Sequence, residues 1–198
     1  LAVDFGVRVN PASQVIRQRV TRGDLGEILG GTMTLRIHRT MKYFQANGAW
    51  RGTWALDGGG AMSNQNIHHI DELICALGMP RRVCMHMRTQ EHDIEAEDVA
   101  CALWEYASGA LVTLYATTCY RPGGWYRQLE LHGTEGAMTS MRGGPFATEI
   151  QHWYTDGAWE TQPAEVDLLP WANNAQNFAA ALRTGAELIC TGEDGRRS

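Results

Sequence analysis

Hydrophobic and polar positions alternate through much of the chain with the two-residue period of a β-strand. This pattern predicts a hairpin over 146–160 and strands over 1–9, 27–40, 82–89, 98–106, 110–118, 126–132 and 137–141. Short turns such as Ala107-Ser108-Gly109 join several of these segments, and strands joined in this way pair antiparallel. The pattern therefore predicts a large, mostly antiparallel sheet.

A longer period, of three to four residues, predicts three helices. The first begins at Pro11 and ends before Gly23, and the third covers 171–182 with Phe178 and Leu182 on one side. The second covers 61–77, where four aliphatic residues share one face: Ile67, Ile70, Ile74 and Leu77. The aromatic-rich segment 41–58 is predicted to be a loop, and residues 191–198 a polar turn.

The strands predicted over 98–106 and 110–118 are apolar on both faces. A sheet with one face in water would show cleaner alternation of apolar and polar residues. We therefore expect helices on one face of the sheet and a second subunit on the other, giving a homo-oligomer. The predicted fold class is α+β, with a large, mostly antiparallel open sheet and helices on one face, in a single domain over 1–198.

Composition narrows the classes of function. The formal net charge of −5 and the scattered basic residues argue against a nucleic-acid partner, and no apolar run is long enough to predict a membrane span. Five cysteines, an odd number without a CxxC spacing, favour a reducing, cytoplasmic location. Because the chain lacks an initiator Met and ends on a capping residue, Ser198, we expect it to be truncated at both ends.

The segment WRGTWALDGGGAMSNQNIHHID, residues 50–71, carries the densest polar chemistry. On a continuous helix Asn64, His68 and Asp71 would share one face, where His68 could move a proton and Asn64 could bind a substrate hydroxyl. The glycines before the helix would let a ligand approach its free N–H groups. They match no nucleotide-binding motif. The alternative is that His68 is a partly buried structural histidine.

A metal site is a rival interpretation of the same histidines. Five residues could serve as ligands: His68, His69, Asp71, His92 and Asp93. Adjacent histidines on a helix point about 100° apart, however, and there is no HExxH motif. We therefore predict no metal.

Two loops combine aromatic and arginine side chains, which suit polar, hydroxylated ligands. The first offers Arg51 and Trp54, and the second, over 119–127, offers Tyr120, Trp125 and Arg127. We predict that these five residues bind substrate. The alternatives are that the first loop caps the core and that the second is only a long hairpin connection.

Taken together, these segments resemble the Gfo/Idh/MocA family (glucose–fructose oxidoreductase, inositol dehydrogenase and rhizopine catabolism). Residues 50–71 resemble its signature segment, and HDIEAEDVACALWEYASGALVTLYATT resembles its central hairpin. FGVRVNPASQVIRQRVTRGDLGEI, LELHGTEGAM and the TGEDGRRS ending are also similar to family segments, so that the resemblance covers nearly the whole chain.

The resemblance implies a role for particular residues. The family pairs an NAD(P)-binding Rossmann domain with a second domain for substrate, and this chain resembles only the second, without the Rossmann glycines or the catalytic lysine. His68 falls on the family's catalytic histidine, which takes a proton from the substrate hydroxyl. Asn64 stands where many members have Asp and would position the substrate or the ribose. Arg8 falls where some members place an arginine near the cofactor.

The sequence therefore predicts the C-terminal substrate-binding domain of an NAD(P)-dependent oxidoreductase. Its substrate would be a small sugar, nucleotide sugar or cyclitol, and NAD or NADP would be bound mainly by a domain missing from this chain, which alone would be inactive. One alternative is a non-catalytic sugar-binding or assembly module that has no cofactor domain. The other is an NAD-dependent relative that cleaves glycosides.

Overall fold

The computed structural model describes residues 1–122, 124–143, 146–161 and 167–198, without the side chains of 146–149. The chain forms two compact units, each built from segments that are distant in the sequence. The sheet unit consists of residues 25–67 and 80–162, and the helical unit of residues 1–24, 68–79 and 163–198. A single domain over 1–198 stays a prediction.

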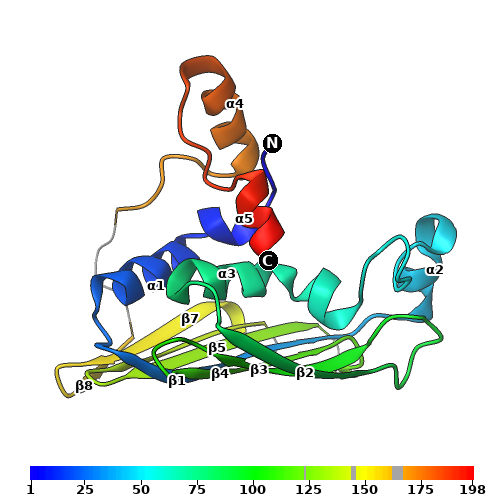
Figure 1. Ribbon diagram of the computed structural model, residues 1–198, viewed down its shortest axis with the longest axis horizontal. Coiled ribbons are helices and arrows are strands. Elements are labelled where there is room, and N and C mark those ends of the chain that lie inside the picture. Colours follow the sequence, from blue (N-terminus) through cyan, green and yellow to red (C-terminus); the bar gives the residue numbers. More distant parts are fainter. Residues whose placement is uncertain (123, 144–145, 162–166) are drawn as a thin grey trace. The chain divides into compact units, whose positions relative to one another are not determined.

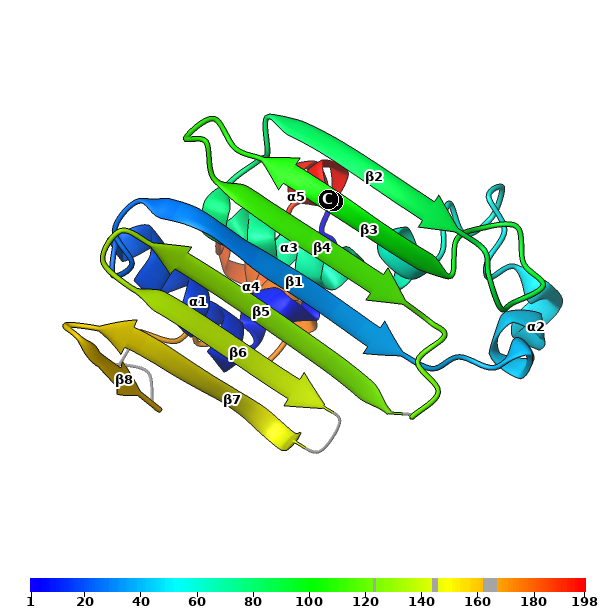
Figure 2. The same ribbon diagram turned by 90° about the horizontal axis from the view of Figure 1, so that it is seen from below.

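The sheet unit is an eight-stranded sheet with the order β2-β3-β4-β1-β5-β6-β7-β8 (Figure 2). Neighbouring strands are antiparallel except β1 and β4, which are parallel. The strands are β1 (Ile28–Ile37), β2 (Arg82–Arg88), β3 (Val99–Glu105), β4 (Leu111–Thr117), β5 (Trp125–Gly133), β6 (Ala137–Gly143), β7 (Phe146–Thr155) and β8 (Ala158–Glu160). These elements and the helices make the chain an α+β protein, as predicted (Figure 1).

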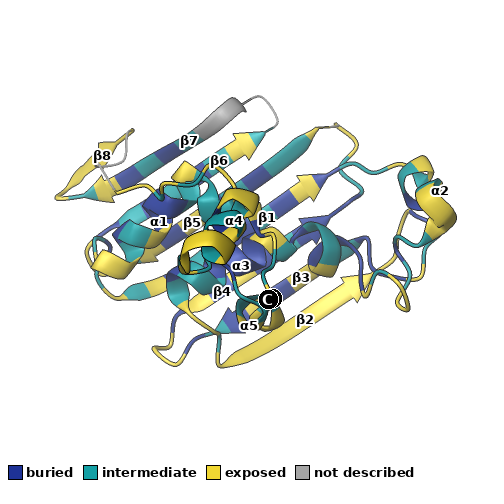
Figure 3. Cartoon of the chain, turned by 90° about the horizontal axis from the view of Figure 1, so that it is seen from above, coloured by how far each residue is buried: buried dark blue, intermediate teal, exposed yellow. Residues whose placement is uncertain are grey.

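The two faces of the sheet differ in burial. Met33 pairs with Leu114 on one side and Leu129 on the other, and all three side chains are fully buried. On the opposite face Leu103 and Leu111 are 42% and 48% exposed. Strand β2 is exposed along its whole length, as its yellow colour in Figure 3 shows. One face of the central strands is thus a packed core, while the other carries accessible apolar side chains.

Two segments, 41–58 and 61–77, differ from the sequence prediction. Residues expected to form a loop contain α2 (Met41–Ala49), interrupted at Asn47 and Gly48, whose φ values are 55° and 83°. The predicted helix over 61–77 is not continuous. A π-helical turn, η2 (Ala61–Gln65), is followed by Asn66 and then by α3 (Ile67–Leu77).

The helical unit contains α3 from His68 onward, η1 (Gly6–Val9), α1 (Pro11–Arg22), α4 (Asn174–Thr184) and α5 (Gly192–Arg197). Helix α1 begins as predicted: the Asn10 side chain accepts a hydrogen bond from Ala12 N at 2.9 Å, and Pro11 occupies the first turn. It ends at Gly23, which has a φ of 91°.

Two predictions for the helical unit are wrong. Residues 1–9 form a short 3₁₀ helix and one isolated bridge instead of a strand. The C-terminal segment is helical instead of a polar turn, because Thr191 and Asp194 form a reciprocal capping box. The last predicted helix forms as α4, in which Phe178 and Leu182 are 42% and 73% exposed.

None of the helices in the described ranges is both long enough and apolar enough to cross a membrane.

Candidate functional site

The last of the three glycines at 58–60 packs the start of the η2 turn against Glu97, in the segment before β3. A Cβ at position 60 would overlap the backbone of Glu97, so this position requires glycine. The Glu97 carboxylate accepts hydrogen bonds from the N–H groups of Gly60 (3.0 Å) and Met62 (2.9 Å). The expectation that the free N–H groups here await a ligand is therefore wrong for these two, because a buried carboxylate of the chain already caps the turn.

Asn64 lies on the η2 turn and is tied to the preceding loop. Its side-chain amide donates to Asp57, which also accepts from the backbone N–H of Gly52 at 2.7 Å, and its carbonyl accepts from Gln65. Because η2 and α3 are separate elements, the stacking of Asn64 and His68 on one continuous helical face is wrong. Asn64 is half-buried, and its role in positioning the substrate or the ribose stays a prediction.

His68 is the exposed member of the polar run on α3. Its ring contacts the Phe5 ring edge to face, with centroids 5.7 Å apart. The neighbouring His69 and Asp71 are 6% and 0% exposed, so the solvent-facing stripe expected to include Asp71 does not form. Within the helical unit, His68 is therefore the accessible imidazole with which a substrate could exchange a proton.

Arg8 is held by acceptors of the helical unit. Its guanidinium forms two hydrogen bonds to Asp71, at 2.8 and 2.6 Å, and a third to the Ile189 carbonyl at 2.9 Å. A further ion pair links it to Asp194 at 3.5 Å. A bidentate pair with a fully buried carboxylate is a strong structural contact. These contacts favour a structural role over cofactor binding, which stays an untested prediction.

The first aromatic loop presents Arg51 and Trp54 differently. The Arg51 guanidinium carbon lies over the rings of Tyr43 and Trp50, 4.7 and 4.6 Å from their centroids. Trp54 is 47% exposed, and its backbone N–H donates to Glu95 at 3.1 Å. Both side chains are accessible to a ligand, as their predicted role requires.

The second loop, of which Gly123 lies outside the described residues, contributes two half-buried rings. The Tyr120 backbone N–H donates to the Ile37 carbonyl at 3.0 Å, and Trp125 begins β5 under the Arg142 guanidinium. Arg127 is only 2% exposed and donates to Ser140 at 2.9 Å. Its contacts favour packing within the sheet, and substrate binding by Arg127 stays a prediction.

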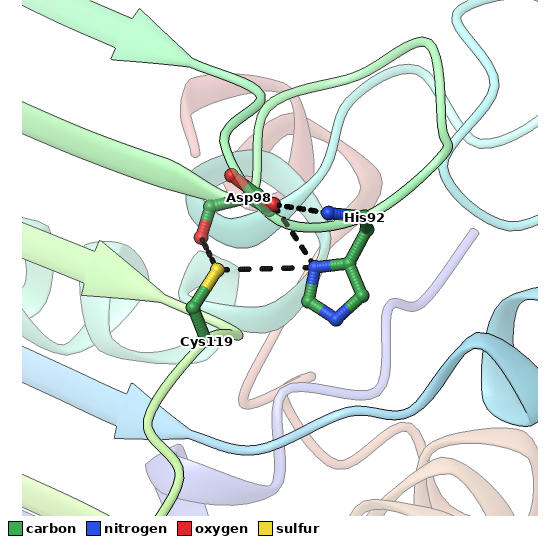
Figure 4. A group of neighbouring side chains, drawn as sticks. All are labelled: His92, Asp98 and Cys119. Atoms are coloured by element: carbon green, nitrogen blue, oxygen red, sulfur yellow. Dashed lines mark hydrogen bonds and ion pairs between the residues drawn. The ribbon is translucent and has the colours of Figure 1, made fainter.

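His92 belongs to a buried cluster that the sequence analysis did not identify, the His92 latch, formed by His92, Asp98 and Cys119 (Figure 4). The Asp98 carboxylate accepts from the backbone N–H groups of Gln90, Glu91 and His92 at 2.8 to 3.0 Å. The His92 ring faces Asp98 through Nδ1 (3.0 Å) and the Arg39 carbonyl through Nε2 (2.8 Å). The latch therefore fixes the loop before β3 to the segment after β1.

The cluster also has three ligand types that metals use, with their atoms within 4.8 Å of one another. Burial raises the pKa of the Cys119 thiol to about 11, so that a metal ion would have to displace the thiol proton to bind there. Asp98 Oδ2 already accepts two backbone hydrogen bonds and the ring contact. This chemistry fits a structural latch better than a metal centre.

A nicotinamide dinucleotide would need a strand, a glycine loop and a helix in succession. The sequence contains no GxGxxG, and the described glycine turn is capped by Glu97. The described residues thus supply an accessible histidine but no dinucleotide-binding loop.

Comparisons with known proteins agree with a domain that lacks a dinucleotide-binding loop. The GFO/IDH/MocA C-terminal domain family matches residues 13–139. The inositol 2-dehydrogenase of Rhizobium meliloti is 24% identical over 98% of this chain and 58% of its own length.

Two solved WlbA dehydrogenases, both in complex with NADH and UDP-GlcNAcA, have similar structures. The protein from Bordetella pertussis is 25% identical with a TM-score of 0.80, and that from Chromobacterium violaceum is 26% identical with a TM-score of 0.85. Each comparison covers 100% of this chain and 56% of the other, so this chain spans little more than half of these relatives. Because the family match extends over more than half of the sequence, the chain belongs to the GFO/IDH/MocA family of oxidoreductases, as its C-terminal domain.

Proposed function

We propose that this chain is the substrate-binding domain of an NAD(P)-dependent oxidoreductase acting on a hydroxyl of a sugar, nucleotide sugar or cyclitol. Family membership supports the oxidoreductase class, and WlbA binds a nucleotide sugar together with NADH. The single observation that carries the assignment is the exposed His68, in the first turn of α3. The five cysteines are unpaired, which supports a reducing cytoplasmic location.

In the proposed reaction the His68 imidazole accepts the proton of the substrate hydroxyl while the carbon loses its hydride and becomes a carbonyl. NAD(P), when bound, supplies the hydride acceptor. Asn64 would position the substrate, and Arg51, Trp54, Tyr120 and Trp125 would contact it. The cofactor would be bound mainly by residues outside this sequence, so that the chain alone is inactive.

The test is His68→Ala in a protein that joins this sequence to its cofactor domain. Loss of a general base should lower kcat/KM by about 10² to 10⁴-fold. His86→Ala, on the exposed strand β2, is the matched control and should leave turnover unchanged. Near wild-type turnover by His68→Ala would overturn the role of His68. Absence of turnover by the wild-type protein itself would instead favour a non-catalytic sugar-binding module. Sugar cleavage without net NADH formation would instead indicate the glycoside-cleaving alternative.

The open face of the sheet supports a second part of the proposal, a homo-oligomer. Leu103 and Leu111 are about half exposed and lie on the same face, because Leu111 pairs with Glu105, two residues beyond Leu103. Exposed apolar side chains grouped in this way are typical of subunit contacts. Leu103→Lys should convert the oligomer to monomers in sedimentation velocity. A monomeric wild-type protein would contradict this part of the proposal.

A further inference from the structure

Two arginines of the sheet unit share one aromatic ring. The guanidinium carbons of Arg39 and Arg51 lie 4.6 and 4.7 Å from the centroid of Tyr43, and Arg51 also lies 4.6 Å from a ring of Trp50. Arg39 follows β1, Tyr43 belongs to α2, and Arg51 follows α2. These four half-buried residues, Arg39, Tyr43, Trp50 and Arg51, are called the arginine stack below.

The arginine stack carries two positive charges that no described carboxylate neutralises by direct contact. Among the residues that the structure describes, neither arginine lies within 4.0 Å of a carboxylate oxygen. The acidic residues of the adjoining segments are directed to other partners: Asp57 accepts from Gly52 and Asn64, and Glu95 accepts from Trp54. Two like charges gathered on one ring make the local potential positive, which favours an incoming anion.

The donors of the stack are held in place and largely unused. Arg39 donates from Nε and one terminal nitrogen to Gln65 Oε1, at 3.2 and 2.9 Å. The same Gln65 amide donates to the Tyr43 hydroxyl at 2.9 Å, so that Gln65 fixes both the ring and one guanidinium. Arg51 forms no hydrogen bond with any described residue. Stacking holds a guanidinium by its face and leaves its edge, which bears the forked donors, open to a ligand.

We propose that the arginine stack binds an anionic group of the substrate, a phosphate or a carboxylate. Both groups match the forked donors of arginine, and paired arginines bind them more tightly than a single lysine would. Gln65 acts as a positioning residue for Arg39. The inference rests on the proposed function only in taking the anion to be part of a sugar substrate. It narrows that substrate to sugar phosphates, nucleotide sugars or sugar acids.

The alternative is that the stack only packs the loop. Arg36 provides the comparison, because its guanidinium also lies over two rings, 6.0 Å from Tyr115 and 5.7 Å from Tyr126, on the sheet. If these arginines only pack against rings, replacing any of the three should affect the affinity for an anionic ligand equally. If the stack binds an anion, replacing Arg39 or Arg51 should lower that affinity and replacing Arg36 should not.

The 198-residue chain is titrated calorimetrically at low ionic strength with glucose 1-phosphate, glucuronate, inorganic pyrophosphate and glucose. The phosphate and carboxylate sugars separate the two sources of charge. We expect the dissociation constant for at least one anionic sugar to rise about 10-fold in Arg39→Gln and in Arg51→Gln, in keeping with the loss of one charge-assisted contact. Arg36→Gln should leave it unchanged. Arg51→Lys should recover part of the affinity for phosphate.

Equal affinity in wild type, Arg39→Gln and Arg51→Gln would overturn the proposal, as would the absence of binding by all three anions. Circular dichroism checks that each variant is folded, and Arg51→Gln removes no hydrogen bond seen in the described structure. The titration needs no cofactor and no turnover. If the arginine variants lose anion binding while the His68→Ala enzyme stays active, the anion site is supported and the catalytic role of His68 is contradicted. If the arginine variants bind as wild type does while His68→Ala is inactive, the catalytic role is supported and the anion site is contradicted.

Discussion

His92 and His68 occupy opposite chemical environments. The His92 ring is 8% exposed, with a carboxylate at one nitrogen, a carbonyl at the other and the Phe44 ring 4.9 Å from its centroid. His68 is exposed, and its one ring contact in the helical unit is with Phe5. Both ring nitrogens of His92 thus face protein oxygens, whereas His68 is an exposed side chain.

This difference favours a structural role for His92 and agrees with the catalytic role proposed for His68. A group that exchanges protons with substrate needs an accessible nitrogen, and His92 has none to offer without breaking the latch. In the sequence the two looked alike, since each stands beside an acidic or polar run. The structural role of His92 and the proposed role of His68 can be tested separately.

The largest expected effect is on folding stability. His92→Ala leaves the Arg39 carbonyl and one side of Asp98 without their partner and should lower the free energy of unfolding by about 2–4 kcal/mol. His68→Ala removes an exposed side chain and should change it by less than about 0.5 kcal/mol. Urea denaturation of the two variants measures both values. Equal losses would remove the distinction between the two histidines.

A smaller effect is expected from pH. Burial alone would raise the pKa of Asp98, but the N–H groups of Glu91, His92 and Gln90 and the His92 ring outweigh it and lower that pKa below 3.8. The folded chain then binds fewer protons than the unfolded chain in this range. The contribution of Asp98 to stability is complete above pH 3.8 and is lost as the pH falls through the lowered pKa.

Asp98→Asn should therefore show a flatter decline in urea midpoint between neutral pH and the region below pH 3.8 than wild type shows. Asp93→Asn changes an exposed carboxylate of the same loop and should retain the wild-type slope. If Asp98→Asn and wild type lose stability in parallel, the latch does not depend on the charge of Asp98.

The smallest expected effect concerns thiol reactivity. Cys84 and Cys101 are exposed, whereas burial raises the pKa of Cys119 to about 11. Labelling of the monomeric Leu103→Lys variant with a thiol reagent near pH 8 should therefore modify Cys84 and Cys101 first and Cys119 slowly. That variant is used because Cys84 pairs with position 103, on the face proposed to contact a second subunit. Adding His92→Ala should speed the labelling of Cys119 by opening the latch. Labelling of Cys119 as fast as Cys84 in the Leu103→Lys variant would show that the latch does not protect it.

The sequence predicts the strands well because their alternation is local. The parallel pairing of β1 with β4 could not be read from it, since periodicity does not reveal which distant strands lie side by side. For the same reason, the sequence did not reveal that Glu97 caps the η2 turn. Its hydrogen bonds to Gly60 and Met62 span 37 and 35 positions, and without them the glycines suggested a ligand contact. The contact between His92 and Asp98 was partly predictable, because the two residues are six positions apart in a short connection between strands.

The position of His68 was predictable from its neighbours and from the family resemblance, but the break at Asn66 was not. Regular spacing of Ile67, Ile70 and Ile74 continues a helical pattern and carries no information about a π-helical turn that precedes it. Arg39 was missed as well, because its relation to Arg51 depends on a ring between them in space.

The Glu97 cap has a consequence for how this domain could be redesigned. Because Glu97, next to β3, holds the backbone of η2, most side chains of the loop over 41–57 can be changed without altering the conformation of the turn. Three residues are exceptions. Asp57 accepts hydrogen bonds from Gly52 and Asn64, Phe44 is buried against His92, and Gly52 has a φ of 72° and no room for a Cβ beside Ile94. Libraries that vary the other residues of 42–56 and spare Gly60 and Glu97 would explore new substrate preferences on a constant scaffold.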